Sequence, residues 1–238
     1  IKYTLKELPD TTSQKDIACT IHELNKDKDV TGIILQMPLP EGINTREIQQ
    51  QILPQKDVEG ITLANMGLIV YGMPMLAPCT AMGAYLLVKA LDLEPSEKAS
   101  SDFAKKMIEQ GKTSKSLYGK EVVVVGHSEI VGKPVSLLLL DNFCTVTTCH
   151  IATKDLKAHT TKADILVVGV GKAGLITDEH IKPGAVVIDI GINRVPALDE
   201  NGNQIMNKKG KPKKKTVGYV DFDKAKEVAG FITPVPGG

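Results

Sequence analysis

The sequence predicts an α/β protein of two domains, of which the larger contains a parallel sheet covered by helices on both faces. In residues 121–190, short apolar strands alternate with helical segments, a pattern typical of a parallel sheet that is buried on both sides. Three of these strands end in turns that contain glycine, and ligands bind at that edge of such sheets. The residues before 85 show a different pattern, so we expect them to form a smaller domain of their own.

Length and composition are those of a globular protein. The chain has 238 residues, of which 42% are hydrophobic and 24% charged, so it can bury the cores of two modest domains. A net charge of +1 provides no broad electrostatic field, which argues against nucleic acid or an anionic membrane as a partner. The longest apolar stretches, such as Val135–Leu140, are far shorter than the ~20 residues that span a bilayer.

The four cysteines fit neither a paired zinc motif nor a dense disulfide framework: Cys19, Cys79, Cys144 and Cys149. We therefore expect reduced thiols and no bound metal. Cys144 and Cys149 alternate with Val146 along a predicted strand and are expected to be buried. Reduced thiols favour a cytoplasmic location. The sequence starts at Ile1 without an initiator methionine, so its lack of a targeting signal is weak evidence and an organelle stays open.

The first domain is predicted to contain helices and one strand. Ile17, Ile21 and Leu24 recur at helical spacing after a turn-forming segment, and Asn44 is the expected N-cap of the next helix. An apolar run that ends at Pro38 is predicted to be a short buried strand. In order, the predicted elements are a helix at 16–26, a strand at 32–38, a helix at 44–53 and, after Pro78-Cys79-Thr80, a helix at 81–91.

The second domain follows a polar segment, about 94–116, which we expect to be a surface insertion near the domain junction. The predicted elements after it are strands at 121–125, 145–149, 163–168 and 185–190, with a helix at 134–140 and short helical segments between. Residues 207–215 carry six lysines and are expected to form a solvated hairpin loop. The alternative for this loop is contact with an acidic partner or an anionic substrate tail.

The loop Gly126–Pro134 joins the first of these strands to its helix. Such a loop is a natural phosphate cradle, because glycine lets the backbone approach a ligand and free N–H groups at the helix start attract negative charge. Its glycines are six residues apart rather than in the GxGxxG pattern, so the loop alone also fits an ordinary turn. Gly169, Gly171 and Gly191 follow later strands and favour a dinucleotide site at this edge.

Six segments then occur in one order along the chain: G-I-I-L-Q-M-P-L-P (Gly32–Pro40), P-Q-K-D-V-E-G (Pro54–Gly60), P-C-T (Pro78–Thr80), Gly126–Pro134, Lys182–Asn193 and I-T-P-V-P-G-G (Ile232–Gly238). Together they resemble the signatures of the bifunctional methylenetetrahydrofolate dehydrogenase / methenyltetrahydrofolate cyclohydrolase family. Each motif alone is modest, whereas six in the family's order are highly specific.

The resemblance implies a substrate domain at 1–84, incomplete at its N-terminus, and a Rossmann-like NAD(P)-binding domain at 85–231, with the active cleft between them. Residues 232–238 would begin a return segment to the substrate domain. It further implies that a homodimer oxidises 5,10-methylenetetrahydrofolate with NAD(P)+ and hydrolyses the methenyl product to 10-formyltetrahydrofolate, in one-carbon metabolism and purine biosynthesis.

The resemblance also assigns roles to single residues. Gln36 and Glu59 are the expected catalytic residues, Gln36 as the partner of a catalytic lysine and Glu59 as the carboxylate that binds the pterin ring. The expected substrate-binding residues are Leu35, Gln36, Met37, Glu59, Pro234, Val235, Pro236, Gly237 and Gly238. The expected cofactor-binding residues are Gly126, His127, Ser128, Ile130, Ile151, Gly169, Gly171 and Ile192.

The chain departs from the family's pattern at several positions. The family's lysine belongs about nine residues before the position of Ile1, and Lys56 does not replace it, because that lysine is structural in the family. A molecule as short as this sequence is expected to show little or no cyclohydrolase activity. Glu59 and Tyr219 stand where the family has Asp; the added methylene at Glu59 moves the carboxylate by about an ångström.

The cofactor is left open between NAD and NADP, with a preference for NAD. NADP-dependent members often carry arginine or serine at the positions of His127 and Ile151, and without arginine a 2′-phosphate loses its best bidentate partner. The second strand ends in Cys149-His150 rather than in the acidic residue that commonly marks NAD, and Lys154 is within reach of a phosphate. His150 is expected to be a packing or ribose neighbour.

Two other functions stay open. Glu59 would suit a dehydrogenase that acts on another pterin one-carbon carrier. A nucleotide-binding module that has lost catalysis is the second alternative, and the absent lysine would support it only if the gene lacks that residue as well.

Overall fold

The computed structural model describes residues 2–92, 117–199, 202–207 and 210–237, so the expected insertion at about 94–116 lies outside the described residues. The chain divides into two compact units, Ile1–Cys79 and Thr80–Gly238, which are described separately. Among the described residues, no helix has the length and apolar character needed to cross a membrane.

The first unit is built from short helices whose N-termini are capped by side chains. Its elements are α1 (Gln14–Lys26), α2 (Thr45–Gln49), the 3₁₀ helix η1 (Pro54–Lys56) and α3 (Leu63–Val70). Ser13 and Asn44 accept hydrogen bonds from the backbone of α1 and α2, as predicted for Asn44. The core of this unit is a cluster of five buried isoleucines: Ile17, Ile21, Ile33, Ile48 and Ile52.

One prediction for the first unit is wrong, and one helix was missed. Residues 32–38 do not form a strand, because only Ile33 finds a neighbouring backbone, in a single parallel bridge to Asp57, and Ile34 is 67% exposed. A strand is defined by its partner, and an apolar run does not reveal whether a partner exists. Helix α3 was not predicted; its sequence L-A-N-M-G-L-I-V is apolar nearly all round and therefore lacks a helical period.

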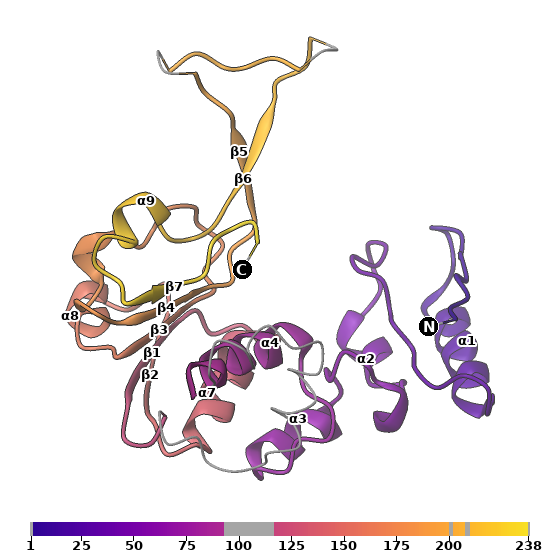
Figure 1. Cartoon of the computed structure of the whole chain (residues 1–238). Coiled ribbons are helices and arrows are strands. Elements are labelled where there is room, and N and C mark those ends of the chain that lie inside the picture. Colours follow the sequence, from indigo (N-terminus) through magenta and orange to yellow (C-terminus); the bar gives the residue numbers. More distant parts are fainter. Residues whose placement is uncertain (1, 93–116, 200–201, 208–209, 238) are drawn as a thin grey trace. The chain divides into compact units, whose positions relative to one another are not determined.

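The second unit contains the predicted parallel sheet (Figure 1), in the order β2-β1-β3-β4-β7. The strands are β1 (Glu121–Val125), β2 (Thr145–Cys149), β3 (Ile165–Val168), β4 (Val186–Asp189) and β7 (Phe231–Ile232), and every pair is parallel. The predicted strands are confirmed, β1 and β2 at the predicted bounds and β3 and β4 within two residues. In this sheet, the two-residue edge strand β7 was missed.

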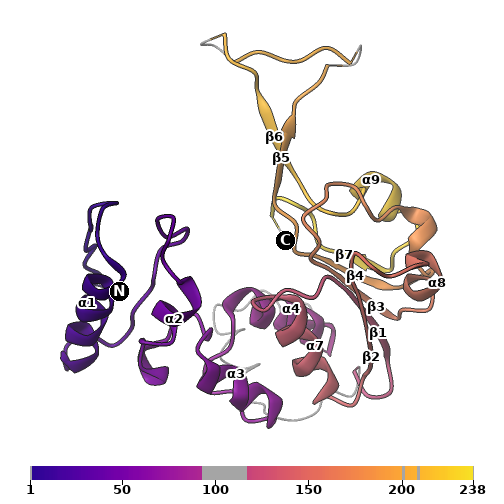
Figure 2. The same ribbon diagram turned by 180° about the vertical axis from the view of Figure 1, so that it is seen from behind.

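Helices cover both faces of this sheet (Figures 1 and 2). Helices α4 (Cys79–Lys89, followed by the 3₁₀ helix η2 at Ala90–Asp92) and α7 (Gly132–Leu140) lie on one side. On the other side lie α8 (Leu156–Thr160), the 3₁₀ helix η3 (Asp178–His180) and α9 (Phe222–Ala225). Cys144 and Cys149 are buried free thiols, as predicted, and burial raises the pKa of Cys144 to about 11.

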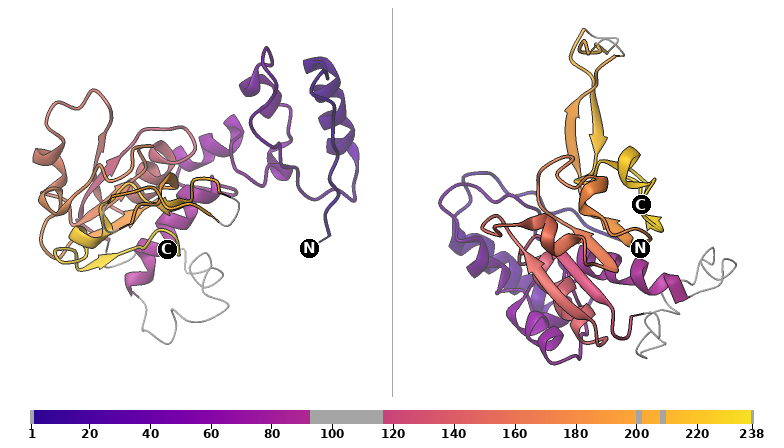
Figure 3. Two further views of the ribbon diagram at one scale, coloured as in Figure 1. Left: turned by 90° about the horizontal axis from the view of Figure 1, so that it is seen from above. Right: turned by 90° about the vertical axis from the view of Figure 1, so that its left-hand side faces the viewer.

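A separate antiparallel hairpin of β5 (Asn193–Pro196) and β6 (Lys214–Val217) projects from the sheet of the second unit (Figure 3). Single bridges between Leu198 and Gln204 and between Met206 and Pro212 extend it. The described lysines of this arm are exposed, so the predicted solvated hairpin is confirmed for that part.

The carboxylate of Asp189, at the end of β4, fastens the base of the hairpin. It accepts hydrogen bonds from the backbone N–H groups of Gly191, Tyr219 and Val220 at 2.8 to 3.0 Å. A side chain at Gly218 would collide with this carboxylate. Tyr219, which had no functional explanation in the sequence, bonds Asp189 through its backbone and packs its half-buried side chain on the core.

Candidate functional site

In the first unit the structure brings Glu59 together with the segment that contains Gln36. Ile33 forms a bridge with Asp57, and its N–H donates to the carbonyl of Lys56 at 2.7 Å. Burial raises the pKa of Glu59, the negative charge of Asp57 raises it further, and the nearby backbone N–H of Leu35 opposes both. Gln36 and Met37 are exposed beside this pair, and Gln36 Nε2 donates to the carbonyl of Met37 at 2.9 Å.

A buried brace holds the loop that carries Glu59. The carboxylate of Asp57 is 1% exposed, and its Oδ2 accepts bonds from the N–H of Thr62 and from Nδ2 of Asn65, both at 2.8 Å. Burial raises the pKa of Asp57, but the hydrogen bonds from Thr62, Asn65 and Ile61 together outweigh it and leave the pKa below its ordinary value. Asp57 is therefore the charged neighbour against which Glu59 is held.

Lys56 serves the same loop as a structural residue, as the sequence suggested. Its ammonium donates to the carbonyls of Leu24, Asn25 and Asp27 at 2.8, 2.8 and 2.6 Å. These carbonyls lie at the C-terminal end of α1, where helix carbonyls lack partners within the helix. All three donors of this side chain are thus engaged, which leaves none for catalysis.

The far end of the loop is fixed by close backbone packing. Gly60 has a φ of +66°, and a Cβ there would collide with the backbone of Ala77. Val58 directly precedes Glu59, and its carbonyl accepts a hydrogen bond from the thiol of Cys79 at 3.4 Å. Glu59 therefore sits on a loop that is fixed at both ends.

In the second unit the carboxyl ends of β1, β3 and β4 form one edge of the sheet, where the glycine turns meet. A Cβ at Gly126 would collide with the carbonyl of Gly169, and a Cβ at Gly132 would collide with the carbonyl of Gly126. Gly126 has a φ of +122°, which side chains rarely adopt. The glycines thus let the β1 turn, the β3 turn and the start of α7 pack backbone against backbone.

One detail of the predicted phosphate cradle is wrong. The first N–H groups of α7 are not free, because that of Lys133 donates to the carbonyl of Ser128 at 3.0 Å and that of Gly132 donates to Ser128 Oγ at 3.4 Å. Pro134 follows and has no N–H. The helix start is closed by its own loop, which the sequence could not show.

The other expected cofactor residues surround this edge, and several are exposed. Three of these residues are exposed isoleucines: Ile130, Ile151 and Ile192 are 55%, 102% and 77% exposed. His127 and Ser128 are exposed as well. Exposed aliphatic side chains next to a glycine turn are typical of a surface that a planar ring covers.

The expected substrate residues Pro234, Val235, Pro236 and Gly237 follow β7 in the second unit, and Gly238 lies outside the described residues. Leu35, Gln36, Met37 and Glu59 belong to the first unit. Two residues of these sites were missed. Asn65 lies in an apolar helix, where no sequence pattern marks it as a structural residue. Asp189 was noted only as part of the Lys182–Asn193 motif, without a role of its own.

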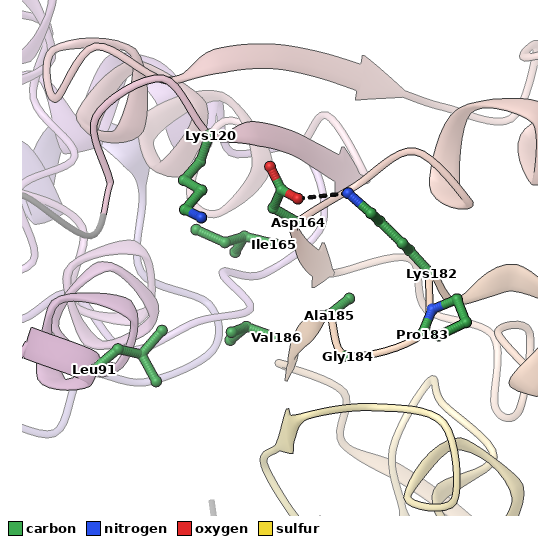
Figure 4. A pocket seen from close by; sticks show the side chains of 9 residues that line it. All are labelled: Leu91, Lys120, Asp164, Ile165, Lys182, Pro183, Gly184, Ala185 and Val186. Carbon is green, nitrogen blue, oxygen red and sulfur yellow. Dashed lines mark hydrogen bonds and ion pairs between the residues drawn. The ribbon is translucent and has the colours of Figure 1, made fainter.

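A cavity of about 240 Å³ lies at the opposite, amino-terminal edge of the sheet (Figure 4). There Lys182 pairs with Asp164 at 2.7 Å, and the hydrogen bond from Lys182 lowers the pKa of Asp164 despite its partial burial. Asp164 also accepts the N–H of Glu121 at 3.0 Å, so these groups join the starts of three strands. Among the described residues no three His, Cys, Asp or Glu side chains are grouped as a metal site.

Comparison with known families matches both units. Residues 1–59 match the tetrahydrofolate dehydrogenase/cyclohydrolase catalytic domain, and residues 103–238 match the tetrahydrofolate dehydrogenase/cyclohydrolase NAD(P)-binding domain. The bifunctional protein FolD of Burkholderia orbicola is 41% identical over 237 residues, which cover 99% of this chain and 70% of that protein. Bifunctional protein FolD 2 of Ruegeria pomeroyi is 46% identical over 226 residues, 95% of this chain and 65% of that protein.

Solved structures agree. FolD of Campylobacter jejuni has a TM-score of 0.77 at 34% identity, over 96% of this chain and 68% of that chain. The Trypanosoma brucei FolD structure, a complex with NADP and an inhibitor, has a TM-score of 0.74 at 32% identity, over 97% of this chain and 68% of that chain. The chain therefore belongs to the tetrahydrofolate dehydrogenase/cyclohydrolase family.

Proposed function

We propose that this protein oxidises 5,10-methylenetetrahydrofolate to the methenyl form with a nicotinamide dinucleotide and hydrolyses the methenyl form to 10-formyltetrahydrofolate. The observation that carries the proposal is the bridge between Ile33 and Asp57, where the N–H of Ile33 donates to the carbonyl of Lys56 at 2.7 Å. It sets a carboxylate beside Gln36, in the segment that resembles the family's folate signature.

On the folate side, Glu59 binds and orients the pterin ring. A carboxylate accepts hydrogen bonds from adjacent ring and amino N–H groups in bidentate geometry. Removal of a hydride leaves a cation and needs no proton transfer, so the oxidation asks only that the methylene carbon be held in place. The fixed loop around Asp57 and Gly60 provides that rigidity.

On the dinucleotide side, the glycine edge of the sheet fits the phosphates. Glycine at 126 and 132 lets the turn pack backbone against backbone, and the N–H groups of the exposed loop 127–130 are the donors we assign to the pyrophosphate. Ile130, Ile151 and Ile192 cover the flat faces of the rings. When bound, the nicotinamide accepts the hydride.

Hydrolysis requires a water aimed at the methenyl carbon and a group that manages its proton. In the family a lysine does this with the glutamine at the position of Gln36. Gln36 is the residue of this sequence that we assign as the partner of that lysine, because its side-chain amide makes only a local bond with Met37 that a ligand can replace. The family's lysine belongs upstream of the position of Ile1.

The finer assignments are part of the proposal. We propose NAD as the preferred cofactor, because neither His127 nor Ile151 offers the planar fork with which arginine binds a 2′-phosphate. We further propose a cytoplasmic homodimer that pairs through its cofactor domains and supplies formyl groups to purine biosynthesis.

The test is absorbance-monitored oxidation of methylenetetrahydrofolate by the full-length protein, with NAD and NADP run in parallel and hydrolysis of the methenyl form assayed separately. Turnover with either cofactor supports the dehydrogenase. No turnover with both, although the dinucleotide binds, would overturn it and favour a module that has lost catalysis. An NADP preference of about tenfold or more would overturn the choice of NAD.

A dehydrogenase of another pterin one-carbon carrier is the second candidate, and Glu59 favours it. Its side chain is one methylene longer than the family's aspartate, which shifts the carboxylate by about an ångström. If E59D improves kcat/KM for methylenetetrahydrofolate by about tenfold, the native site is shaped for a different ring. A decrease in E59D supports tetrahydrofolate as the carrier.

A further inference from the structure

The arm formed by residues 193–217 projects from the second unit and carries two open strand edges (Figures 1 and 3). Among the described residues, β5 and β6 pair with each other in a two-stranded sheet and with no further strand. Each strand therefore uses the backbone groups on one of its sides and leaves those on the other side unpaired. Such an edge is a template on which a further strand can pair.

The hydrogen-bond alternation of the arm shows which groups of β6 face outward. The N–H of Ala197 donates to the carbonyl of Lys213 at 2.9 Å, so these residues occupy a hydrogen-bonded position. Bonded and non-bonded positions alternate along an antiparallel pair, so Lys215, two residues on, also faces β5. Lys214 and Thr216 therefore direct their N–H and C=O groups away from β5. No described residue outside the arm accepts a backbone bond from either N–H.

The outer edge of β5 is less suited to a further strand. Its outward residues are Arg194 and Pro196, which lie opposite Thr216 and Lys214. Proline has no N–H, so this edge offers one outward donor where the edge of β6 offers two. A strand that adds to the arm is therefore expected on β6.

The arm is also strongly basic. Its described charged residues are five cations and one carboxylate: Arg194, Lys211, Lys213, Lys214, Lys215 and Asp199. The carboxylate of Asp199 accepts hydrogen bonds from Asn203, the N–H at 2.8 Å and Nδ2 at 3.4 Å, so it serves the local turn. The four lysines are exposed. The edge of β6 therefore repels a basic strand and attracts an acidic one.

We propose that the open edge of β6 binds an acidic, extended segment of a partner protein by strand addition. A strand that pairs with Lys214 and Thr216 satisfies their outward groups and directs its own side chains alternately to the two faces of the arm. Lys213 and Lys215 share one face, so carboxylates at every second residue of the partner meet both ammonium groups. The inference is independent of the proposed function, because it uses no residue assigned to folate or dinucleotide.

A second copy of this chain fits the same edge less well. Antiparallel pairing of β6 with the β6 of another copy would bring lysines against lysines, and like charges directly opposite each other destabilise a sheet. Lysine and proline at strand edges are known to block association of this kind. The same lysines turn that repulsion into attraction when the incoming strand is acidic.

The test is fluorescence anisotropy of the full-length protein with labelled peptides of about eight residues. One peptide alternates Glu with Thr, and two control peptides alternate Gln or Lys with Thr. We expect the acidic peptide to bind at least about fivefold more tightly than the neutral one, with an affinity that falls at high salt. The basic peptide should not bind. Failure of the acidic peptide to bind, or equal binding of the acidic and neutral peptides, would overturn the inference.

Matched variants test the two parts of the contact. K215Q should weaken binding of the acidic peptide, and K214Q, which loses the same charge on the opposite face, should weaken it less. Equal losses would assign the attraction to the overall charge of the arm and overturn strand addition. T216P removes an outward N–H that β5 does not use and should abolish binding, whereas T216V keeps the N–H and should bind as the native protein does. Native binding by T216P would also overturn the proposal.

Amide hydrogen exchange separates strand addition from attachment through lysine side chains. In the free protein the outward amides of Lys214 and Thr216 should exchange faster than the inward amides of Lys215 and Val217. The acidic peptide should slow the outward amides, and protected inward amides in T216P would show that its hairpin is intact. Peptide binding without slower exchange at the outward amides would overturn the proposal. Protection of those amides before any peptide is added, in a protein that is a dimer by light scattering, would assign the edge to a second copy instead.

Discussion

The side-chain amide of Asn65 donates to the buried carboxylate of Asp57 at 2.8 Å across eight residues of sequence. The same amide donates to the carbonyl of Pro54 at 2.9 Å, so one side chain spans the segment that leads to Glu59. Asp57 Oδ1 is buried without a hydrogen-bond partner among the described residues, which leaves the carboxylate dependent on the bonds to Oδ2. The position of the catalytic candidate Glu59 therefore depends on a residue of α3 that touches no expected ligand.

Asn65→Ala should destabilise the first unit by about 2–3 kcal/mol, because it leaves a buried carboxylate and a carbonyl without their donor. Urea unfolding monitored on the full chain measures this. Gln55→Ala, at an exposed position of the same segment, is the control and should cost less than about 0.5 kcal/mol. Equal losses in the two variants would show that the brace contributes nothing.

The brace also shows which parts of the molecule could be predicted from sequence. Strands β1 and β2 were predicted at their observed bounds, because short runs of β-branched residues between turn signals leave little choice. Asn44 was predicted as a cap because its chemistry is local. The bond between Asn65 and Asp57 joins a helix to a loop, and only the folded chain brings the two together.

In the candidate site, too, local features could be predicted from the sequence and contacts between distant residues could not. The glycine turn at Gly126 was visible as a strand, a glycine and a helix in succession. The sequence did not show that this turn packs against Gly169, 43 residues later. It also did not show that Ser128 closes the start of α7. The strand predicted at 32–38 failed because an apolar run carries no information about whether a neighbouring strand is present.

Glu59→Gln should stabilise the protein at neutral pH while it weakens folate binding. The pKa of Glu59 is raised by burial and then by Asp57, so the folded state holds the proton more tightly than the unfolded chain. Wild-type stability therefore falls as pH rises from the unfolded pKa to the folded pKa, and glutamine escapes that loss. We expect a gain of about a few tenths of a kcal/mol at pH 7 that vanishes below pH 4. Urea unfolding at the two pH values checks this, and a gain of equal size at both would refute it.

Gly132→Ala should disrupt the glycine edge, because its Cβ would meet the carbonyl of Gly126 and the Cα of His127. Backbone atoms cannot move aside as a flexible side chain does, so we expect a loss of about 2 kcal/mol or more and much weaker dinucleotide binding. Gly83→Ala is the matched control, since Gly83 lies in α4 with open space around it. That change should stabilise the protein by about 0.5–1 kcal/mol. Thermal unfolding and dinucleotide titration measure both variants.

The thiols should differ in reactivity toward a disulfide reagent at pH 8. Cys19 and Cys79 are exposed, whereas Cys144 and Cys149 are buried and burial raises the pKa of both thiols, that of Cys144 to about 11. Two thiols should therefore react in the native protein and four after denaturation. Cys144→Ser and Cys149→Ser should leave the number of native reactive thiols at two, and a drop to one in either variant would contradict the assignment.

Asp189→Asn should loosen the base of the β5–β6 hairpin. Both carboxylate oxygens accept backbone N–H groups, Oδ1 from Gly191 and Tyr219 and Oδ2 from Val220. An asparagine has one acceptor oxygen, so its amide nitrogen must face at least one backbone N–H, and two donors cannot satisfy each other. We expect a cost of about 2–3 kcal/mol, from a buried donor without an acceptor. Faster amide hydrogen exchange at residues 219 and 220 should accompany it, because these amides lose their acceptor.

The matched control is Asp223→Asn, which removes an exposed carboxylate paired with Lys226 one turn along α9. Such a surface pair is screened by solvent and contributes little, so no change in exchange at residues 219 and 220 is expected. The hairpin arm itself should keep its strand pairing in Asp189→Asn, because the bonds between β5 and β6 do not involve Asp189. If exchange instead rises along the whole arm and residues 219 and 220 stay protected, Asp189 does not fasten the base, and the hairpin is held by its packing on the core alone.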